Sequence, residues 1–182
     1  MPDHTTIVDE QIDQNSPVTQ PLMFALRDNI EASQWHPYDD GDGVLWDFDE
    51  DGSIGTVIGP TFEAGYSYLF TCTRITQGST TNRFAQWRAN YSDGSNSGYN
   101  TFSDRDVLNT PLAFSLMILM PSAPIGHVSH FQTYGIRLGQ YVADATSATA
   151  IVTSVDIRMS EGTFSGGKII LYKKKDGGGL VG

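Results

Sequence analysis

An acidic run has the residue types and the spacing of a cation site. Asp47, Asp49 and Asp51 occupy alternate positions and Gly52 follows them, which is how a calcium-binding loop begins. The match ends at the twelfth position of such a loop, where Ile58 replaces the bidentate glutamate. Two interpretations stay open: a solvated hairpin turn, which the interleaved aromatic residues favour, and a Ca²⁺ site ligated by these three aspartates. The neighbouring aspartates that would assist such a site are Asp39, Asp40 and Asp42.

The sequence contains no recognised catalytic pattern. His127 and His130 are three residues apart, a spacing that shares a face on a helix but not on a strand, and the residues around them are strand-like. The nucleophile elbow Gly-x-Ser-x-Gly does not occur in the sequence. A polysaccharide hydrolase has only generic carboxylates in its favour. We expect a protein that is not an enzyme and that needs no cofactor.

Aromatic side chains supply a second kind of candidate site. Trp87, Tyr99 and Phe102 are the residues expected to stack on sugar rings, and the loop from Tyr91 to Phe102 is rich in Gly, Ser, Asn and Asp. The competing interpretation is that these rings fill a protein core or a subunit interface, which is the commoner use of large aromatic residues. Both interpretations stay open at this point.

Composition limits the classes of partner. The chain has 182 residues and a formal net charge of −10, which argues against a surface that binds nucleic-acid phosphates. The basic run at residues 173–175 is short and typical of a solvated strand end. We therefore expect no nucleic-acid partner.

Cysteine content and hydropathy add two further limits. The single cysteine, Cys72, excludes an intramolecular disulfide framework and is expected to be buried among apolar residues. The longest apolar run, residues 112–120, is far shorter than the roughly 20 residues that a spanning helix needs. Residues 1–20 are polar and acidic, unlike a signal peptide. We expect no membrane insertion and no export by the Sec route.

The two ends of the chain predict different elements. Residues 16–34 have the spacing of one amphipathic helix, with Ser16 as the cap, Pro17 at the first helical position and Pro21 as an alternative start. Residues 1–15 are polar and lack periodicity, so we expect an arm that orders only against a partner. We place a docking arm and helix at residues 1–38, one sandwich domain at 39–175 and a Gly-rich tail at 176–182.

Most of the chain after the helix has the period-two pattern of strands. Residues 44–48 and 54–58 flank a turn at Asp51-Gly52 and are predicted to form a hairpin. Further strands are predicted at residues 66–75, 83–91, 112–120, 128–138, 148–159 and 168–173. About eight strands without intervening helices indicate a mainly β protein, an antiparallel β-sandwich that is jelly-roll-like.

Motifs at both ends resemble segments of tailed-bacteriophage virion proteins. The first is Asp9-Glu-Gln-Ile12 followed by Ser16-Pro-Val-Thr19, Leu22 and Leu26-Arg-Asp-Asn29; the second is Phe164-Ser-Gly-Gly-Lys-Ile-Ile-Leu-Tyr172; a third, shorter one is Ala64-Gly-Tyr-Ser-Tyr68. The match covers about a fifth of the chain, and it departs from the usual pattern after Asn29, where Ile-Glu replaces Pro-Ile/Leu-Ala. The resemblance implies that the residues that dock to a partner are Ile12, Val18, Leu22, Leu26 and Arg27.

The resemblance implies a structural role in a virion. The expected protein is a capsid decoration protein or a tail or fibre component that docks to capsid or tail proteins through its N-terminal arm and forms a homo-oligomer, with a trimer favoured. The alternative hypothesis is a carbohydrate-binding module that recognises host surface glycans through Trp87, Tyr99 and Phe102.

Overall fold

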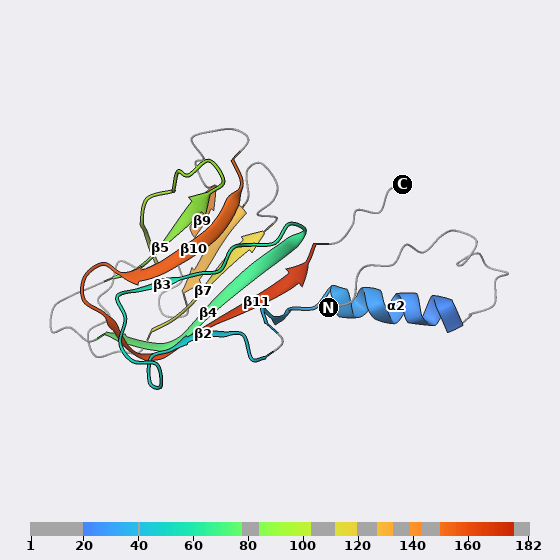
Figure 1. The fold of residues 1–182 in the computed structure, drawn as a ribbon, viewed down its shortest axis with the longest axis horizontal. Helices are drawn as coiled ribbons and strands as arrows, with labels where there is room; N and C mark the ends of the chain where they lie inside the picture. The colour runs from blue at the N-terminus through green and yellow to red at the C-terminus, as the bar shows by residue number, and fades with distance from the viewer. Residues whose placement is uncertain are drawn as a thin grey trace.

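The described part of the computed structural model has two antiparallel sheets and one short helix, α2 (Gln20–Ala32), and this confirms the predicted mainly β sandwich (Figure 1). The helix stands to one side of the two sheets in this view. The residues that the structure describes are 20–39, 41–77, 84–102, 112–119, 127–132, 139–142 and 150–176.

The larger sheet has seven strands and is built around the two longest ones. The central pair is β4 (Tyr66–Gln77) and β11 (Phe164–Lys175). Beyond β4 follow β7 (Leu112–Leu119), β8 (His127–Gln132) and β9 (Gly139–Val142), and beyond β11 lie β1 (His36–Pro37) and β2 (Val44–Asp47). Because β1 is already part of this sheet, the sandwich begins before the boundary at residue 39.

The smaller sheet has four strands in the order β3 (Thr56–Ile58), β10 (Val152–Met159), β5 (Ala85–Tyr91) and β6 (Asn100–Thr101). The chain changes sheet repeatedly, for example from β4 to β5 and from β10 to β11, as in jelly-roll-like sandwiches. The described residues thus contain eleven strands instead of about eight, and β1, β6 and β9 are the short ones that the sequence pattern did not predict.

The predicted hairpin of residues 44–48 with 54–58 is wrong. β2 pairs with β11 in the larger sheet, whereas β3 pairs with β10 in the smaller one. The Asp51-Gly52 turn signal is real, because residues 48–51 form a turn and Gly52, with φ +88°, directly follows it. A turn sequence reports the local reversal of the chain but not the sheet that each flanking strand joins.

The core lies between the two sheets and follows the period-two alternation of the strands. In β5, Ala85, Trp87, Ala89 and Tyr91 are buried and the residues between them are half-buried. The smaller sheet thus presents one apolar and one polar face. The largest fully buried side chains of both sheets are Trp87, Tyr68, Phe70, Phe102, Phe164, Ile75, Leu116, Ile118, Ile157, Ile169 and Leu171.

Cys72 and Tyr68 are titratable groups of this core. Cys72 is buried in β4, as expected, and burial raises the pKa of its thiol well above the ordinary value. Burial also raises the pKa of Tyr68 to about 12. The Tyr68 hydroxyl oxygen accepts a hydrogen bond from the Glu63 backbone N–H at 2.7 Å, and its ring stacks on Phe62 with centroids 4.2 Å apart.

The helix ends earlier than the sequence pattern predicted. The predicted helix extends to residue 34, but α2 stops at Ala32. The Ser33 hydroxyl donates to the carbonyl of Ile30 at 2.7 Å, and Nε2 of His36 lies 2.8 Å from the carbonyl oxygen of Glu31. These side chains occupy carbonyls that a longer helix would use, and so they cap the last turn.

The central strand pair contains a sharp irregularity. The register of β4 and β11 shifts between Gly166 and Lys168, and Arg74 and Gly167 have φ +54° and +91°. A Cβ at Gly167 would lie 2.4 Å from the carbonyl oxygen of Thr73. Glycine is required here both by its φ and by the approach of the neighbouring backbone.

We predict that Gly167→Ala lowers the free energy of unfolding by about 3 kcal/mol, because it adds a backbone clash to an unfavourable φ. Gly52→Ala is the matched control, since Gly52 has φ +88° and nothing within 4 Å of an added Cβ, and it should cost about 1 kcal/mol. Urea unfolding of both variants measures the difference. Equal losses would contradict the close approach of β4 and β11 at this bulge.

Candidate functional site

The helix α2 carries the most conspicuous apolar surface of the described residues. Met23, Leu26 and Ile30 are 54%, 43% and 59% exposed, and their spacing places them near one face of the helix. Phe24 is 47% exposed on a neighbouring face. Large apolar side chains at helical spacing and open to solvent are typical of a surface that binds a partner.

The predicted docking residues are placed unevenly by the structure. Leu22, Leu26 and Arg27 all lie on α2, and the guanidinium of Arg27 bonds Asp28 at 2.7 Å and covers the ring of Phe24. The exposure of Leu26 agrees with a docking role. Ile12 and Val18 lie outside the described residues.

The acidic run around Asp47 forms a tight turn that uses its own carboxylates. Asp47 is 4% exposed, and its carboxylate accepts the backbone N–H of Asp49 at 3.1 Å and pairs with Lys168 at 2.5 Å. The carboxylate of Asp51 accepts the backbone N–H of Asp47 at 3.0 Å. The carboxylates of Asp47 and Asp51 thus bond the backbone of their own turn, whose flanking strands lie in different sheets.

The structure does not bring further acidic ligands to this turn. Asp39 accepts the backbone N–H groups of Gly41 and Gly43, and Asp42 accepts that of Val44. Within the described residues, no group of three His, Cys, Asp or Glu side chains is placed to hold a metal ion. The Ca²⁺ site is thus carried by the sequence pattern alone; Asp40 lies outside the described residues.

The three residues predicted to bind glycans do not form one platform. Trp87 and Phe102 are each 1% exposed and pack between the sheets, so their rings cannot stack on a sugar, and this part of the prediction is wrong. The reason is the alternation in β5, which points Trp87 to the same side as Ala85 and Ala89. Only Tyr99, in the loop before β6, is half-buried at the surface.

Tyr99 belongs to a cluster that sequence reasoning missed. The guanidinium carbon of Arg158 lies 3.3 Å from the centroid of the Tyr99 ring, and that of Arg88 lies 4.8 Å from it. Arg88 and Arg158 are on the outward face of neighbouring strands β5 and β10. No local signal links residues that lie about 70 positions apart, because the pairing of β5 with β10 is a tertiary contact.

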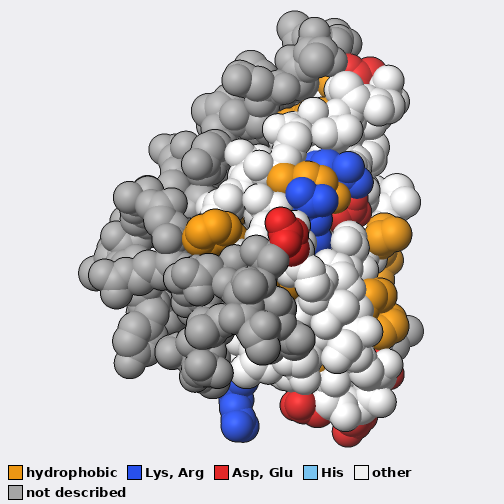
Figure 2. All heavy atoms as spheres, turned by 90° about the vertical axis from the view of Figure 1, so that its left-hand side faces the viewer, with side chains coloured by type: hydrophobic (Ala, Val, Ile, Leu, Met, Phe, Trp, Pro, Cys, Tyr) orange, Lys and Arg blue, Asp and Glu red, His pale blue; other side chains and the backbone are white. Residues whose placement is uncertain are grey.

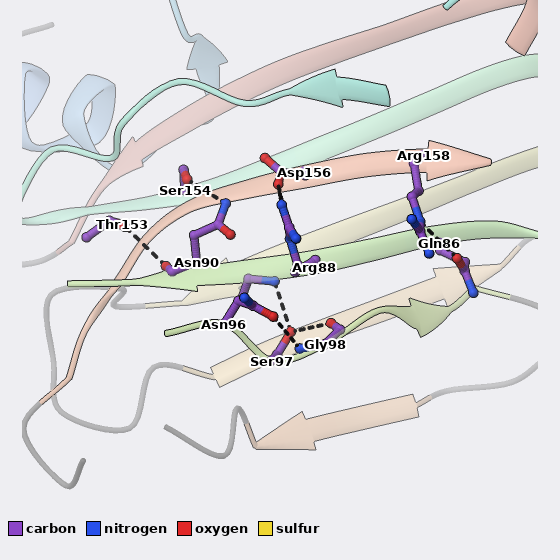
Figure 3. Close-up of polar contacts among 11 residues, drawn as sticks. Gln86, Arg88, Asn90, Asn96, Ser97, Gly98, Thr153, Ser154, Asp156 and Arg158 are labelled. Atoms are coloured by element: carbon purple, nitrogen blue, oxygen red, sulfur yellow. Dashed lines mark hydrogen bonds and ion pairs between the residues drawn. The ribbon is translucent and has the colours of Figure 1, made fainter. Parts of the chain in front are cut away.

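The outward face of the smaller sheet is polar along both strands (Figure 3). Nε and Nη2 of Arg88 donate to Oδ2 of Asp156 at 3.2 and 2.5 Å. Nε of Arg158 donates to Gln86 at 3.1 Å, and Asn90 donates to Ser154 at 3.0 Å. In the side view of Figure 2, basic side chains lie against hydrophobic ones with acidic side chains beside them. These contacts hold the polar side chains of this face in place.

The basic end of β11 is partly neutralised. Lys173 pairs with Glu63 at 3.0 Å, and its ammonium lies 5.4 and 5.2 Å from the ring centroids of Tyr38 and Tyr66. The side chain of Lys173 is 19% exposed. This lysine therefore joins β11 to the loops around it, whereas the sequence predicted only a solvated strand end.

The structure places both histidines on one strand. His127 and His130 both lie on β8, opposite Leu119 and Leu116 of β7. An offset of three residues along a strand places their Cβ atoms on opposite faces of the sheet. A shared metal ion is therefore not supported by the backbone.

The comparisons with known proteins add no relative. No family model, no curated protein and no solved structure matches this chain. Among the described residues, no helix is long and apolar enough to cross a bilayer.

We predict that Asp47→Asn destabilises the protein at neutral pH and that the difference from the unchanged chain shrinks at acid pH. The hydrogen bond from Lys168 is the largest cause that lowers the pKa of Asp47 below its ordinary value. Its stabilising effect is present above the unfolded pKa of about 3.9 and is lost as the pH falls through the folded pKa. Urea unfolding between pH 7 and pH 2 measures this.

Asp49→Asn is the control for the Asp47 experiment, because no hydrogen bond or ion pair among the described residues uses the Asp49 carboxylate. It should show a smaller loss at pH 7. A difference between Asp47→Asn and the unchanged chain that stays constant down to pH 2 would contradict the ion-pair explanation.

Proposed function

We propose that this chain is a non-enzymatic structural protein of a tailed-phage virion. It docks to capsid or tail proteins through its N-terminal arm and α2 and displays the β-sandwich, either as a capsid decoration protein or as a tail or fibre component. The observation that carries the proposal is the exposed apolar face of α2 beside a well-packed sandwich. The motifs at both ends of the sequence, described above, supply the link to virion proteins.

The docking step rests on the apolar area that α2 leaves in water. Full burial of a side chain such as Leu or Ile contributes about 1.5–3 kcal/mol. Met23, Leu26 and Ile30 are each about half exposed. Binding that buries them in a partner groove is therefore stabilised by a substantial part of this free energy. A helix that lays an apolar face into a groove is a common mode of protein recognition.

The sandwich has the properties of the displayed part. Its core is continuous across both sheets, so it needs no contact with α2 to bury its apolar residues. The net charge of −10 keeps copies apart before assembly. Such a domain is suited to a homo-oligomer, for which we favour a trimer, assembled in the host cytoplasm and located on the virion.

We predict that the double variant Leu26→Glu, Ile30→Glu folds normally but is lost from particles. Both side chains are exposed, so circular dichroism and urea unfolding should change little, whereas the added charges oppose burial in a partner groove. In a phage that encodes this chain, purified particles should contain at least about tenfold less of the variant protein, which corresponds to about 1.4 kcal/mol of binding free energy. Quantitative mass spectrometry of the particles measures the loss.

The matched control for this experiment is Ile58→Glu. Ile58 is 76% exposed on β3, so it receives the same chemical change on the sandwich instead of the helix. Particles should retain this variant at the normal level. Normal incorporation of the α2 double variant would contradict docking through the helix.

We predict that removal of residues 1–35 leaves the oligomer intact. This cut keeps β1, which pairs with β11, and removes α2 together with the arm. Light scattering should give a mass about three times that of the chain, which is 19.9 kDa when complete, both with and without the deleted segment. A trimer that falls apart on deletion would contradict assembly by the sandwich, and a monomer in both forms would contradict the trimer.

A further inference from the structure

The cluster of Arg88, Asp156, Arg158 and Tyr99 carries one positive charge in excess. Two guanidinium groups contact the Tyr99 ring, and within the described residues only the carboxylate of Asp156 pairs with either of them. Arg88 directs two of its nitrogens to a single oxygen of that carboxylate. The cluster can therefore attract one anionic group, although the net charge of the protein is −10.

Arg158 has hydrogen-bond donors left over for such a group. Its Nε is used by Gln86 at 3.1 Å, and no hydrogen bond among the described residues uses its two terminal nitrogens. The contact with the Tyr99 ring at 3.3 Å fixes the plane of the guanidinium. A planar guanidinium with both terminal nitrogens available is suited to bidentate binding of a carboxylate.

Asp156 supplies an independent sign that the cluster is incomplete. This residue is 4% exposed, and its Oδ1 finds no hydrogen-bond donor among the described residues, although Oδ2 binds Arg88. A buried carboxylate oxygen without a donor is unfavourable and uncommon in native proteins. A donor from a bound molecule, or from a water that the molecule holds in place, satisfies it.

The loop before β6 holds Tyr99 in position before any ligand binds. The backbone N–H of Ala89 donates to Ser97 at 3.0 Å, and that of Gly98 donates to Asn96 at 3.0 Å. Gly94 and Gly98 have φ +81° and +68°, values that glycine adopts without strain. A ring held in this way orders Arg158 in advance, which lowers the entropy cost of binding.

The neighbouring side chains indicate the kind of molecule that carries the anion. Gln86 and Asn90 of β5, and Ser154 of β10, present amides and a hydroxyl on the same outward face as Arg158 (Figure 3). Such groups hydrogen-bond to the hydroxyls of a sugar. An acidic peptide would bring apolar side chains as well, and this row of amides and hydroxyls provides no apolar pocket for them.

We propose that the outward face of the smaller sheet binds a saccharide that carries carboxylate groups, with Arg158 as the carboxylate receptor and Tyr99 as the residue that positions it. The amides and hydroxyls of β5 and β10 bind the sugar hydroxyls. This inference rests on the smaller sheet alone and does not depend on docking through α2. Failure of one proposal therefore leaves the other untouched.

The test is titration calorimetry of the full chain with oligosaccharides at low salt. The probes are oligomers of galacturonate, of hyaluronan and of sialic acid, with a galactose oligomer of equal length as the neutral control. At least one acidic oligomer should bind, its affinity should fall as salt is added, and the galactose oligomer should not bind. Binding of neutral and acidic oligomers with equal affinity, or of none of the acidic ones, overturns the proposal.

Variants test whether binding depends on Arg158 itself or only on the positive charge of the protein surface. Arg158→Gln should weaken binding by about tenfold or more, and Tyr99→Leu should weaken it less, because the charge remains while its position is lost. Arg27→Gln is the matched control, because this exposed arginine also covers an aromatic ring, but on α2. Equal effects of Arg27→Gln and Arg158→Gln on binding overturn the assignment of Arg158. Binding of polyglutamate as tightly as the acidic sugars also overturns the proposal, because it would indicate an acidic protein partner.

Discussion

The pairing of β4 with β11 is the interaction on which the other elements depend. Each strand has twelve residues, and they pair from Tyr66↔Lys175 to Gln77↔Phe164, with register shifts between Phe164 and Gly166 and between Gly166 and Lys168. β7 attaches to the free edge of β4, and β1 and β2 attach to β11. Some 90 residues of sequence separate these two strands. Their pairing therefore closes a long loop, which costs chain entropy and gives the fold a high contact order.

This constraint also decides which side chains are free for function. Once β4 and β11 are fixed, the smaller sheet must present its apolar face to them, and the period-two alternation leaves Gln86, Arg88 and Asn90 pointing outward. The large aromatic side chains of β5 are used in the core. Recognition on this sheet therefore depends on arginine, amide and hydroxyl groups, with Tyr99 supplied by a loop.

The sequence predicted those features that depend on local pattern. The strands β4, β5, β7 and β10 have clear alternation or apolar runs, and the sandwich follows from them. The alternation of β5 also indicated that Trp87 is buried, since Ala85, Ala89 and Tyr91 lie on the same side of the strand. The predicted glycan site was based on aromatic residue type and not on this alternation. The separation of β2 from β3 and the meeting of Arg88, Tyr99 and Arg158 depend on tertiary pairing, which no local pattern encodes.

The positions of α2 and of the Arg158 cluster would allow docking through the helix and saccharide binding at the cluster at the same time. α2 continues into β1, which pairs with the end of β11 at Lys173, and Figure 1 shows the helix on the opposite side of the sandwich from the arrowhead of β10. Arg158 is the penultimate residue of β10 and therefore lies at the arrowhead end of the strand. A particle bound to α2 would thus hold the arginine face away from its own surface. That geometry allows one small domain to be anchored at one end while its other end remains open to a saccharide.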